Sequence, residues 1–138
     1  MSYLIDTNVI SELRKGKRAA PAVASWFASL ADDEVFLSAL TLGEIRRGIE
    51  SIRRRDSAAA SALESWLGRI AEAHRDRIVA VDRAIVEEWG RINAPDPLPV
   101  IDGLLAATAK VAGLTLATRN TEDIARSGVN FFNPFDFT

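Results

Sequence analysis

Short apolar runs along the chain alternate with longer stretches in which apolar residues recur every three or four positions. The short runs predict five buried strands, at residues 3–5, 35–37, 78–81, 114–117 and 129–132. The periodic stretches predict helices at residues 9–13, 21–31, 41–54, 57–73, 83–92, 102–112 and 121–126. Because such alternation is typical of a parallel sheet covered on both faces, we expect one α/β domain over residues 1–138, with a mostly parallel sheet of about five strands flanked by helices.

Polar residues at the predicted helix ends fit common capping patterns. Ser57 and Asp82 stand where helices begin, so their side-chain oxygens can accept hydrogen bonds from free backbone N–H groups. Thr41 and Glu44 have the spacing of a capping box, and Asp102 opens the helix after a proline-rich loop. Each of these acids, taken alone, is thus explained as a helix cap.

Composition excludes several kinds of chemistry. The chain has no cysteine and a single histidine, His74, which excludes disulfides, thiolate sites and a two-histidine ribonuclease mechanism. No Gly-rich nucleotide loop and no serine nucleophile motif occurs. No segment approaches the roughly 18 consecutive apolar residues of a membrane span, so we expect a soluble, cytoplasmic protein.

The net charge of −2 argues against general binding of nucleic acid, but the basic residues are unusual in kind. Of the 17 basic residues only Lys15, Lys17 and Lys110 are lysines, which leaves 14 arginines. Five of these crowd into residues 46–55. Arginine favours bidentate contacts with phosphate, although a solvated helix face would give a similar run.

Four acids that are distant in the sequence fall near predicted junctions between strands and helices. Asp6 follows the first strand, Glu44 lies near the start of the helix after the second, Asp102 begins a helix, and Asp123 follows the fourth strand. Ligands of open α/β sheets bind at the carboxyl ends of the strands, so these carboxylates are expected at one edge. Carboxylates brought together repel unless a cation joins them, and oxygen ligands suit Mg²⁺ or Mn²⁺. From spacing alone, a phosphatase-like or regulatory α/β domain stays open.

Four segments of the chain together resemble the PIN domain, and in particular the VapC-type toxins of bacterial toxin–antitoxin pairs. The segments are Leu4–Leu13, Ser38–Ile49, Ile101–Ala109, and Leu116–Asn120 with Asp123. They occur in the family's order and spacing across almost the whole chain. One departure is Ile124, where the family often has Phe.

The resemblance implies a ribonuclease that uses Mg²⁺ or Mn²⁺, works as a homodimer, and is silenced by an antitoxin whose C-terminal segment occupies the groove. It implies metal-assisted, in-line hydrolysis of RNA that leaves a 5′-phosphate and a 3′-hydroxyl. The residues that match the family's acids, and so the implied catalytic and metal-binding residues, are Asp6, Glu44, Asp102 and the more variable Asp123. The matching polar residues around the metal are Thr7, Asn8, Thr118 and Asn120.

Other side chains receive more limited interpretations. Arg46, Arg47 and Arg119 are candidates for steering the RNA backbone toward the acids. The aromatic residues Trp26, Phe27, Trp66 and Trp89 lie on apolar helix faces and are expected in the core or at a dimer interface. Two other functions remain open: a catalytically silent PIN-like module that binds a partner, which would be expected to have lost an acid, and a nuclease that acts on DNA.

Overall fold

The computed structural model describes all 138 residues, and its elements alternate along the chain as expected. The strands are β1 (Tyr3–Ile5), β2 (Val35–Ser38), β3 (Ile78–Val79), β4 (Thr115–Ala117) and β5 (Phe131–Phe132). The α-helices are α1 (Thr7–Leu13), α2 (Pro21–Ala28), α3 (Ala39–Arg53), α4 (Ser57–Ala73), α5 (Arg83–Ile92), α6 (Val100–Ala112) and α7 (Thr121–Ile124). Short 3-10 turns are η1 (Gly16–Arg18), η2 (Asp32–Glu34), η3 (Ala125–Ser127) and η4 (Pro134–Asp136).

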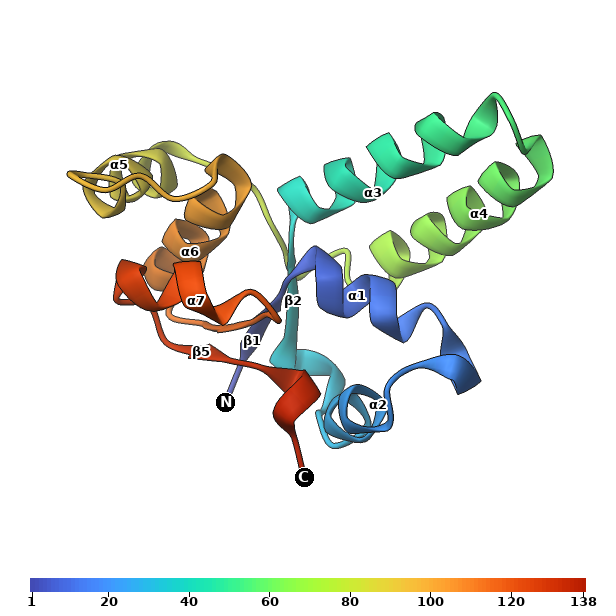
Figure 1. Cartoon of the computed structure of the whole chain (residues 1–138), viewed down its shortest axis with the longest axis horizontal. Helices are drawn as coiled ribbons and strands as arrows, with labels where there is room; N and C mark the ends of the chain where they lie inside the picture. The colour runs from blue at the N-terminus through green and yellow to red at the C-terminus, as the bar shows by residue number, and fades with distance from the viewer.

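The five strands form one parallel sheet in the order β3-β2-β1-β4-β5, which confirms the expected α/β architecture (Figure 1). In the register, Tyr3 of β1 lies opposite both Val35 and Thr115. The chain builds outward from β1 through β2 to β3, then returns to the other side of β1 with β4. Because the two halves diverge at β1, a crevice at the carboxyl ends of β1 and β4 is the expected ligand site.

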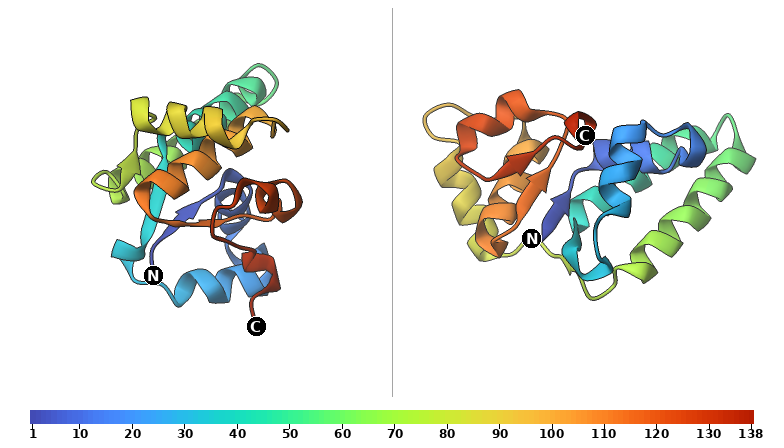
Figure 2. Two further views of the ribbon diagram at one scale, coloured as in Figure 1. Left: turned by 90° about the vertical axis from the view of Figure 1, so that its left-hand side faces the viewer. Right: turned by 90° about the horizontal axis from the view of Figure 1, so that it is seen from below.

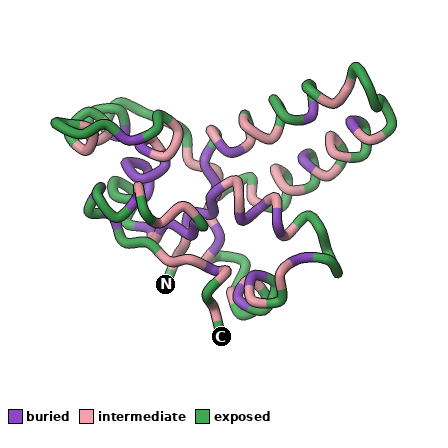
Figure 3. Tube along the Cα trace, in the orientation of Figure 1, coloured by how far each residue is buried: buried purple, intermediate pink, exposed green.

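Helices cover both faces of the sheet, as the two further views in Figure 2 show. Successive strand residues point to opposite faces, so Leu4 packs with the cluster of α6 and α7, whereas Ile5 packs with that of α1 and α2. Trp26, only 2% exposed, lies in the second cluster, which confirms its expected place in the core. The most deeply buried positions follow the strands and the sheet-facing sides of these helices (Figure 3).

Helices α3 and α4 pack side by side as a hairpin that projects from the sheet (Figure 1). A small cluster of Ile49, Ala60 and Leu67 joins the two helices. On its surface, Arg46 and Arg53 both pair with Glu64. Part of the arginine run is therefore engaged in ion pairs within the hairpin. None of the helices has both the length and the apolar composition that a membrane span requires.

Several predicted helix starts were wrong by a few residues. Helix α3 begins at Ala39 and is capped by Ser38, because β2 runs directly into the helix. Thr41 therefore caps nothing, and its buried hydroxyl has no hydrogen-bond partner. Helix α4 is capped by Asp56 instead of Ser57, through a 3.0 Å bond from the Ala59 amide.

Other boundaries changed less. Helix α6 begins at Val100, so Asp102 lies in its first turn and is not its cap. Asp82 caps α5 as predicted, accepting from the Ile85 amide. The predicted strands at 78–81 and 129–132 are each reduced to two paired residues. They are the edge strands, where pairing with only one neighbour limits the ladder.

Candidate active site

Asp6 lies at the carboxyl end of the central strand β1 and is only 5% exposed. Its Oδ1 accepts a 2.6 Å hydrogen bond from the Thr7 amide, so it also caps helix α1. Its Oδ2 accepts from the Thr118 hydroxyl at 2.7 Å and from the Asn8 amide group at 3.3 Å. Since Thr118 follows the neighbouring strand β4, the parallel pairing of β1 and β4 brings these side chains together.

Glu44 reaches the same place from α3. Its Oε1 accepts a 2.6 Å hydrogen bond from the Thr7 hydroxyl. Thr7 thus holds two acids, Asp6 through its amide and Glu44 through its side chain. The direct passage from β2 into α3 places the start of this helix beside α1, at the carboxyl edge of the sheet.

Asp102 joins the site through Asn120. The Asn120 side chain donates to Asp102 Oδ2 at 2.7 Å, and the Asn120 amide donates to the Thr118 hydroxyl at 3.0 Å. A continuous hydrogen-bonded chain therefore connects three acids that lie far apart in the sequence. In order, its members are Glu44, Thr7, Asp6, Thr118, Asn120 and Asp102. All four polar residues singled out from the sequence, Thr7, Asn8, Thr118 and Asn120, bond to an acid or to one another.

Asp123 lies at the margin of this network, on the short helix α7. Its carboxylate forms a long 3.5 Å ion pair with Arg126 and no hydrogen bond with another acid. It is nevertheless close enough to Asp102 to raise the pKa of that carboxyl. Its neighbour Glu122 is exposed and exerts no such effect. The charge of Asp123, and not that of Glu122, thus acts on Asp102, and Ile124, 1% exposed, serves packing.

The acids interact electrostatically. Burial raises the pKa of Asp6, and the charges of Asp102 and Glu44 add to this in spite of the hydrogen bonds that oppose it. Burial also raises the pKa of Asp102, with further contributions from Asp123 and Glu44. Each anion is therefore costly beside the others, which a bound cation would relieve.

The side chains do not form a complete coordination sphere. No three acids in the structure stand together closely enough to hold a metal ion as they are. The oxygen-only donor set and the mutual repulsion of the acids nonetheless fit a hard divalent cation such as Mg²⁺, which keeps several of its waters and needs few protein ligands.

The three candidate arginines differ in their surroundings. Arg46 is paired with Glu50 and Glu64 on the hairpin. Arg47 lines an open hollow of about 490 Å³ beside Glu44. Arg119 lies between Thr118 and Asn120, and its guanidinium covers the ring of Phe135 at 4.4 Å from the centroid.

Three hollows lie around Arg14 and Trp66, and we call them together the furrow. They measure about 180, 240 and 390 Å³ and share Arg14 and Trp66 in their walls. The first of them also reaches Thr7 and Glu44. Trp66 is only partly buried, so its ring belongs both to the packing under the hairpin and to this surface.

Sequence reasoning missed two residues near the site. Glu12, 9% exposed, accepts hydrogen bonds from Lys15 and from the Ala20 amide, which lower its pKa, and the charge of Arg119 adds to this. Phe135 belongs to the C-terminal turn η4, where nothing in the local pattern indicates its contact with Arg119. His74, the single histidine, lies at the end of α4, where its ring bonds to the Ile70 carbonyl.

The chain is an α/β protein with a five-stranded parallel sheet, and its carboxylates gather at the carboxyl ends of the central strands. The model of the PIN domain matches residues 3–128, and the chain belongs to this family.

Individual relatives agree with this assignment. The chain is 34% identical over 139 residues to toxin FitB of Neisseria gonorrhoeae, covering 96% of this chain and 97% of that protein. It is 29% identical over 140 residues to a VapC ribonuclease of Sinorhizobium fredii, covering 96% and 97%. The crystal structure of FitAcB from Neisseria gonorrhoeae superimposes with a TM-score of 0.90 at 31% identity, covering 98% of this chain and 99% of that one. DNA-bound VapBC from Salmonella typhimurium shares the fold, with a TM-score of 0.79 at 20% identity and coverage of 97% and 98%.

Proposed function

We propose that this protein is a metal-dependent endoribonuclease and the toxin of a bacterial toxin–antitoxin pair. The observation that carries the proposal is the hydrogen-bonded chain that unites Asp6, Glu44 and Asp102 at one edge of the sheet. The similarity to toxin FitB and to a VapC ribonuclease supports the same activity. RNA, as the proposed substrate, implies action in the cytoplasm.

In this proposal Asp6 and Asp102 bind Mg²⁺ or Mn²⁺, and Glu44 and Asp123 complete its surroundings or hold a second ion. The cation, when bound, offsets charge on the phosphate and lowers the pKa of a water. The chain's own contribution is orientation: Thr118 and Thr7 fix both oxygens of Asp6, and Asn120 holds one oxygen of Asp102. The reaction is an in-line hydrolysis that leaves a 5′-phosphate and a 3′-hydroxyl.

The test is end-mapped cleavage of total bacterial RNA by the purified protein. We expect discrete cuts with Mg²⁺ or Mn²⁺, none with chelator, and none for Asp102→Asn. Asp123→Asn should lower the rate, whereas the matched control Glu122→Gln, which changes an exposed neighbour, should not. Absence of both cleavage and metal binding would favour a silent partner-binding module, and equal cleavage of DNA would contradict the RNA assignment.

The proposal includes a protein partner. The structure matched from Klebsiella pneumoniae is a toxin–antitoxin complex, and it supports the fold at 24% identity. We propose that the C-terminal segment of a cognate antitoxin occupies the furrow shared by Arg14 and Trp66. Since the furrow reaches Glu44, a segment bound there would also obstruct the acids.

The proposal also includes a homodimer. The hollow beside Glu44 is lined mainly by apolar residues, including Leu40, Val81 and Ile101. Val100, adjacent to this hollow in the sequence, is 61% exposed. Apolar surface of this kind is the type that subunit contacts cover.

A further inference from the structure

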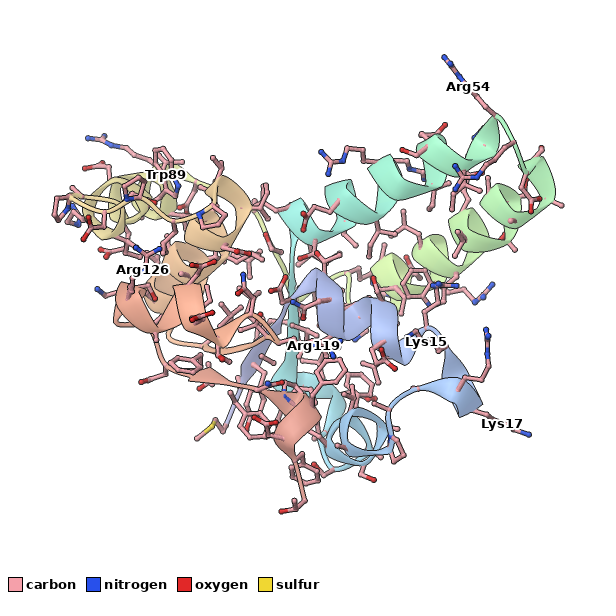
Figure 4. The ribbon with its side chains drawn as sticks, in the orientation of Figure 1. Lys15, Lys17, Arg54, Trp89, Arg119 and Arg126 are labelled. Atoms are coloured by element: carbon pink, nitrogen blue, oxygen red, sulfur yellow. The ribbon has the colours of Figure 1, made fainter.

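The backbone at Arg119 is fixed to the acid network. Its amide donates to Asn8 Oδ1 at 3.2 Å, and its neighbours Thr118 and Asn120 bond to Asp6 and Asp102. The residue is therefore held at the edge where the acids meet. Figure 4 shows Arg119 near the middle of the molecule, between α1 and the C-terminal turn, whereas Arg54 lies at the far end of the α3–α4 hairpin.

The Arg119 side chain lies on an aromatic platform. Its guanidinium carbon is 4.4 Å from the centroid of the Phe135 ring. The ring itself is partly buried against the cluster of α1 and α2, and the Phe135 amide donates to Asn133 Oδ1 at 3.0 Å. A guanidinium over a ring face is attracted by the ring quadrupole, while its N–H groups still point outward in its plane.

The guanidinium is not neutralised by a carboxylate. Arg119 is exposed, and its guanidinium takes part in none of the ion pairs of the structure. Glu12 is the carboxylate whose pKa the charge of Arg119 helps to lower, after the hydrogen bonds from Lys15 and the Ala20 amide. It makes no ion pair with Arg119, because it already accepts these two bonds. Arg46, by contrast, is paired with two glutamates. Arg119 thus combines a fixed backbone, a supported guanidinium and free donors.

We propose that Arg119 binds a backbone phosphate of the substrate next to the cleaved bond, and that Phe135 is the positioning residue that holds its guanidinium for this contact. The inference rests on the proposed ribonuclease function. Its chemistry is the bidentate pairing of a guanidinium with two phosphate oxygens. Phe135 lies in the C-terminal turn, outside residues 3–128, which the PIN-domain model matches. The aromatic ring under Arg119 therefore comes from a part of the chain that the matched segment does not include.

The experiment measures binding of a single-stranded RNA that spans a mapped cleavage site, in an Asp102→Asn background that prevents cleavage. Arg119→Ala should weaken binding about tenfold or more, the loss expected for a charged hydrogen bond. It should also reduce the salt slope of binding by about 0.7, as for one contact with a single-strand phosphate. Phe135→Leu should weaken binding roughly two- to fivefold, and Phe135→Tyr, which keeps the ring face, should restore it.

A double-mutant cycle separates positioning from general structure. In an Arg119→Ala background, Phe135→Leu should cause no further loss, because the group it positions is gone. Arg54→Ala and Phe137→Leu serve as controls, since the first removes a distant exposed arginine and the second removes a nearby aromatic ring that carries no cation. Both should bind RNA like the parent.

The outcomes distinguish this inference from the proposed function. If the parent cleaves and binds RNA but Arg119→Ala binds equally well, the inference is overturned and the ribonuclease assignment stands. Equal losses from Phe135→Leu with and without Arg119 would show a structural effect only, and overturn the positioning role. If the unmodified protein neither cleaves nor binds RNA, the proposed function fails and the inference fails with it.

Discussion

Asp6 and Asp102 are acids whose surroundings in the fold raise the pKa of each carboxyl. Burial is the main cause of the raised pKa of each, and the neighbouring acids add to it. A domain that only had to be stable would not gather carboxylates in this way. The arrangement is the usual compromise at functional sites, in which stability is given up for a reactive or ligand-binding environment.

We therefore predict that Asp102→Asn stabilises the metal-free protein while it abolishes RNA cleavage. The amide keeps an oxygen that can accept the bond from Asn120 but removes the charge. The charge lies favourably in the first turn of α6, but the raised pKa shows that burial and repulsion outweigh this gain. The midpoint of thermal unfolding in chelator should rise by a few degrees.

The same prediction has a pH dependence. A raised pKa in the folded state means that the acid's contribution to stability is complete below its ordinary value of 3.8 and is lost as the pH rises through the folded-state value. In chelator, the difference in unfolding midpoint between Asp102→Asn and wild type should therefore grow as the pH rises from about 4 toward neutrality. A difference that stays constant with pH would contradict the electrostatic explanation.

At the scale of elements, the packing of α5 on α6 depends on Gly103. A Cβ atom there would lie 2.9 Å from Asn93 Nδ2 and 3.2 Å from two atoms of the Trp89 ring. A methyl group at this position would make the side chains of Asn93 and Trp89 shift, next to Asp102 in the first turn of α6. The sequence placed Trp89 on an apolar helix face but gave no indication that its partner had to be a glycine.

We predict that Gly103→Ala destabilises the fold by about 1–3 kcal/mol, as overpacking does. The matched control is Gly90→Ala in α5, where the new methyl group meets nothing within 4 Å. That change should stabilise the protein by roughly 0.5–1 kcal/mol, because alanine loses less backbone entropy in a helix. Chemical denaturation of both variants measures the difference, and a neutral Gly103→Ala would contradict the close packing.

Helices α1 and α2 are connected through Glu12, which bonds to Lys15 and to the backbone at the start of α2. The Lys15 hydrogen bond, followed by that from Ala20, lowers the pKa of Glu12. A lowered pKa contributes stability that is present above the unfolded-state value and is lost as the pH falls through the folded-state value. Glu12→Gln should thus lower the unfolding midpoint at neutral pH and have a smaller effect in acid, which thermal unfolding from neutral pH down to about 3 would measure.

At the scale of the whole molecule, the apolar surface is uneven. Val100, 61% exposed, precedes Ile101, which lines the hollow of α3 and α6, and Phe131, 40% exposed, lies on the edge strand β5. The proposed homodimer uses the first of these surfaces. The second lies on the other side of β1 from the α3 hairpin and its strand β2.

We predict that Val100→Lys shifts the protein from dimer to monomer in light scattering, because a charged side chain at a subunit contact would be buried without a partner. Phe131→Lys, a matched apolar-to-lysine change at the opposite edge, should leave the dimer intact. Circular dichroism checks that both variants fold. A dimer that survives Val100→Lys would place the subunit contact elsewhere.

The sequence alone predicts the element order and the parallel α/β architecture, whereas the site residues came from the resemblance to the PIN domain. Local periodicity is enough for this, because apolar spacing fixes which side of a helix or strand is buried. The acids could also be placed near the carboxyl ends of strands, since that follows from their position after each apolar run.

Which side chains meet depends on how distant segments pack. Thr7 and Glu44 are 37 residues apart, and Thr118 and Asp6 are 112 apart, so their hydrogen bonds depend on strand order and helix placement. The contact of Arg119 with Phe135 likewise requires the C-terminal turn to fold back against the segment that follows β4. Such pairings arise from the packing of distant segments, which no local pattern of residues encodes.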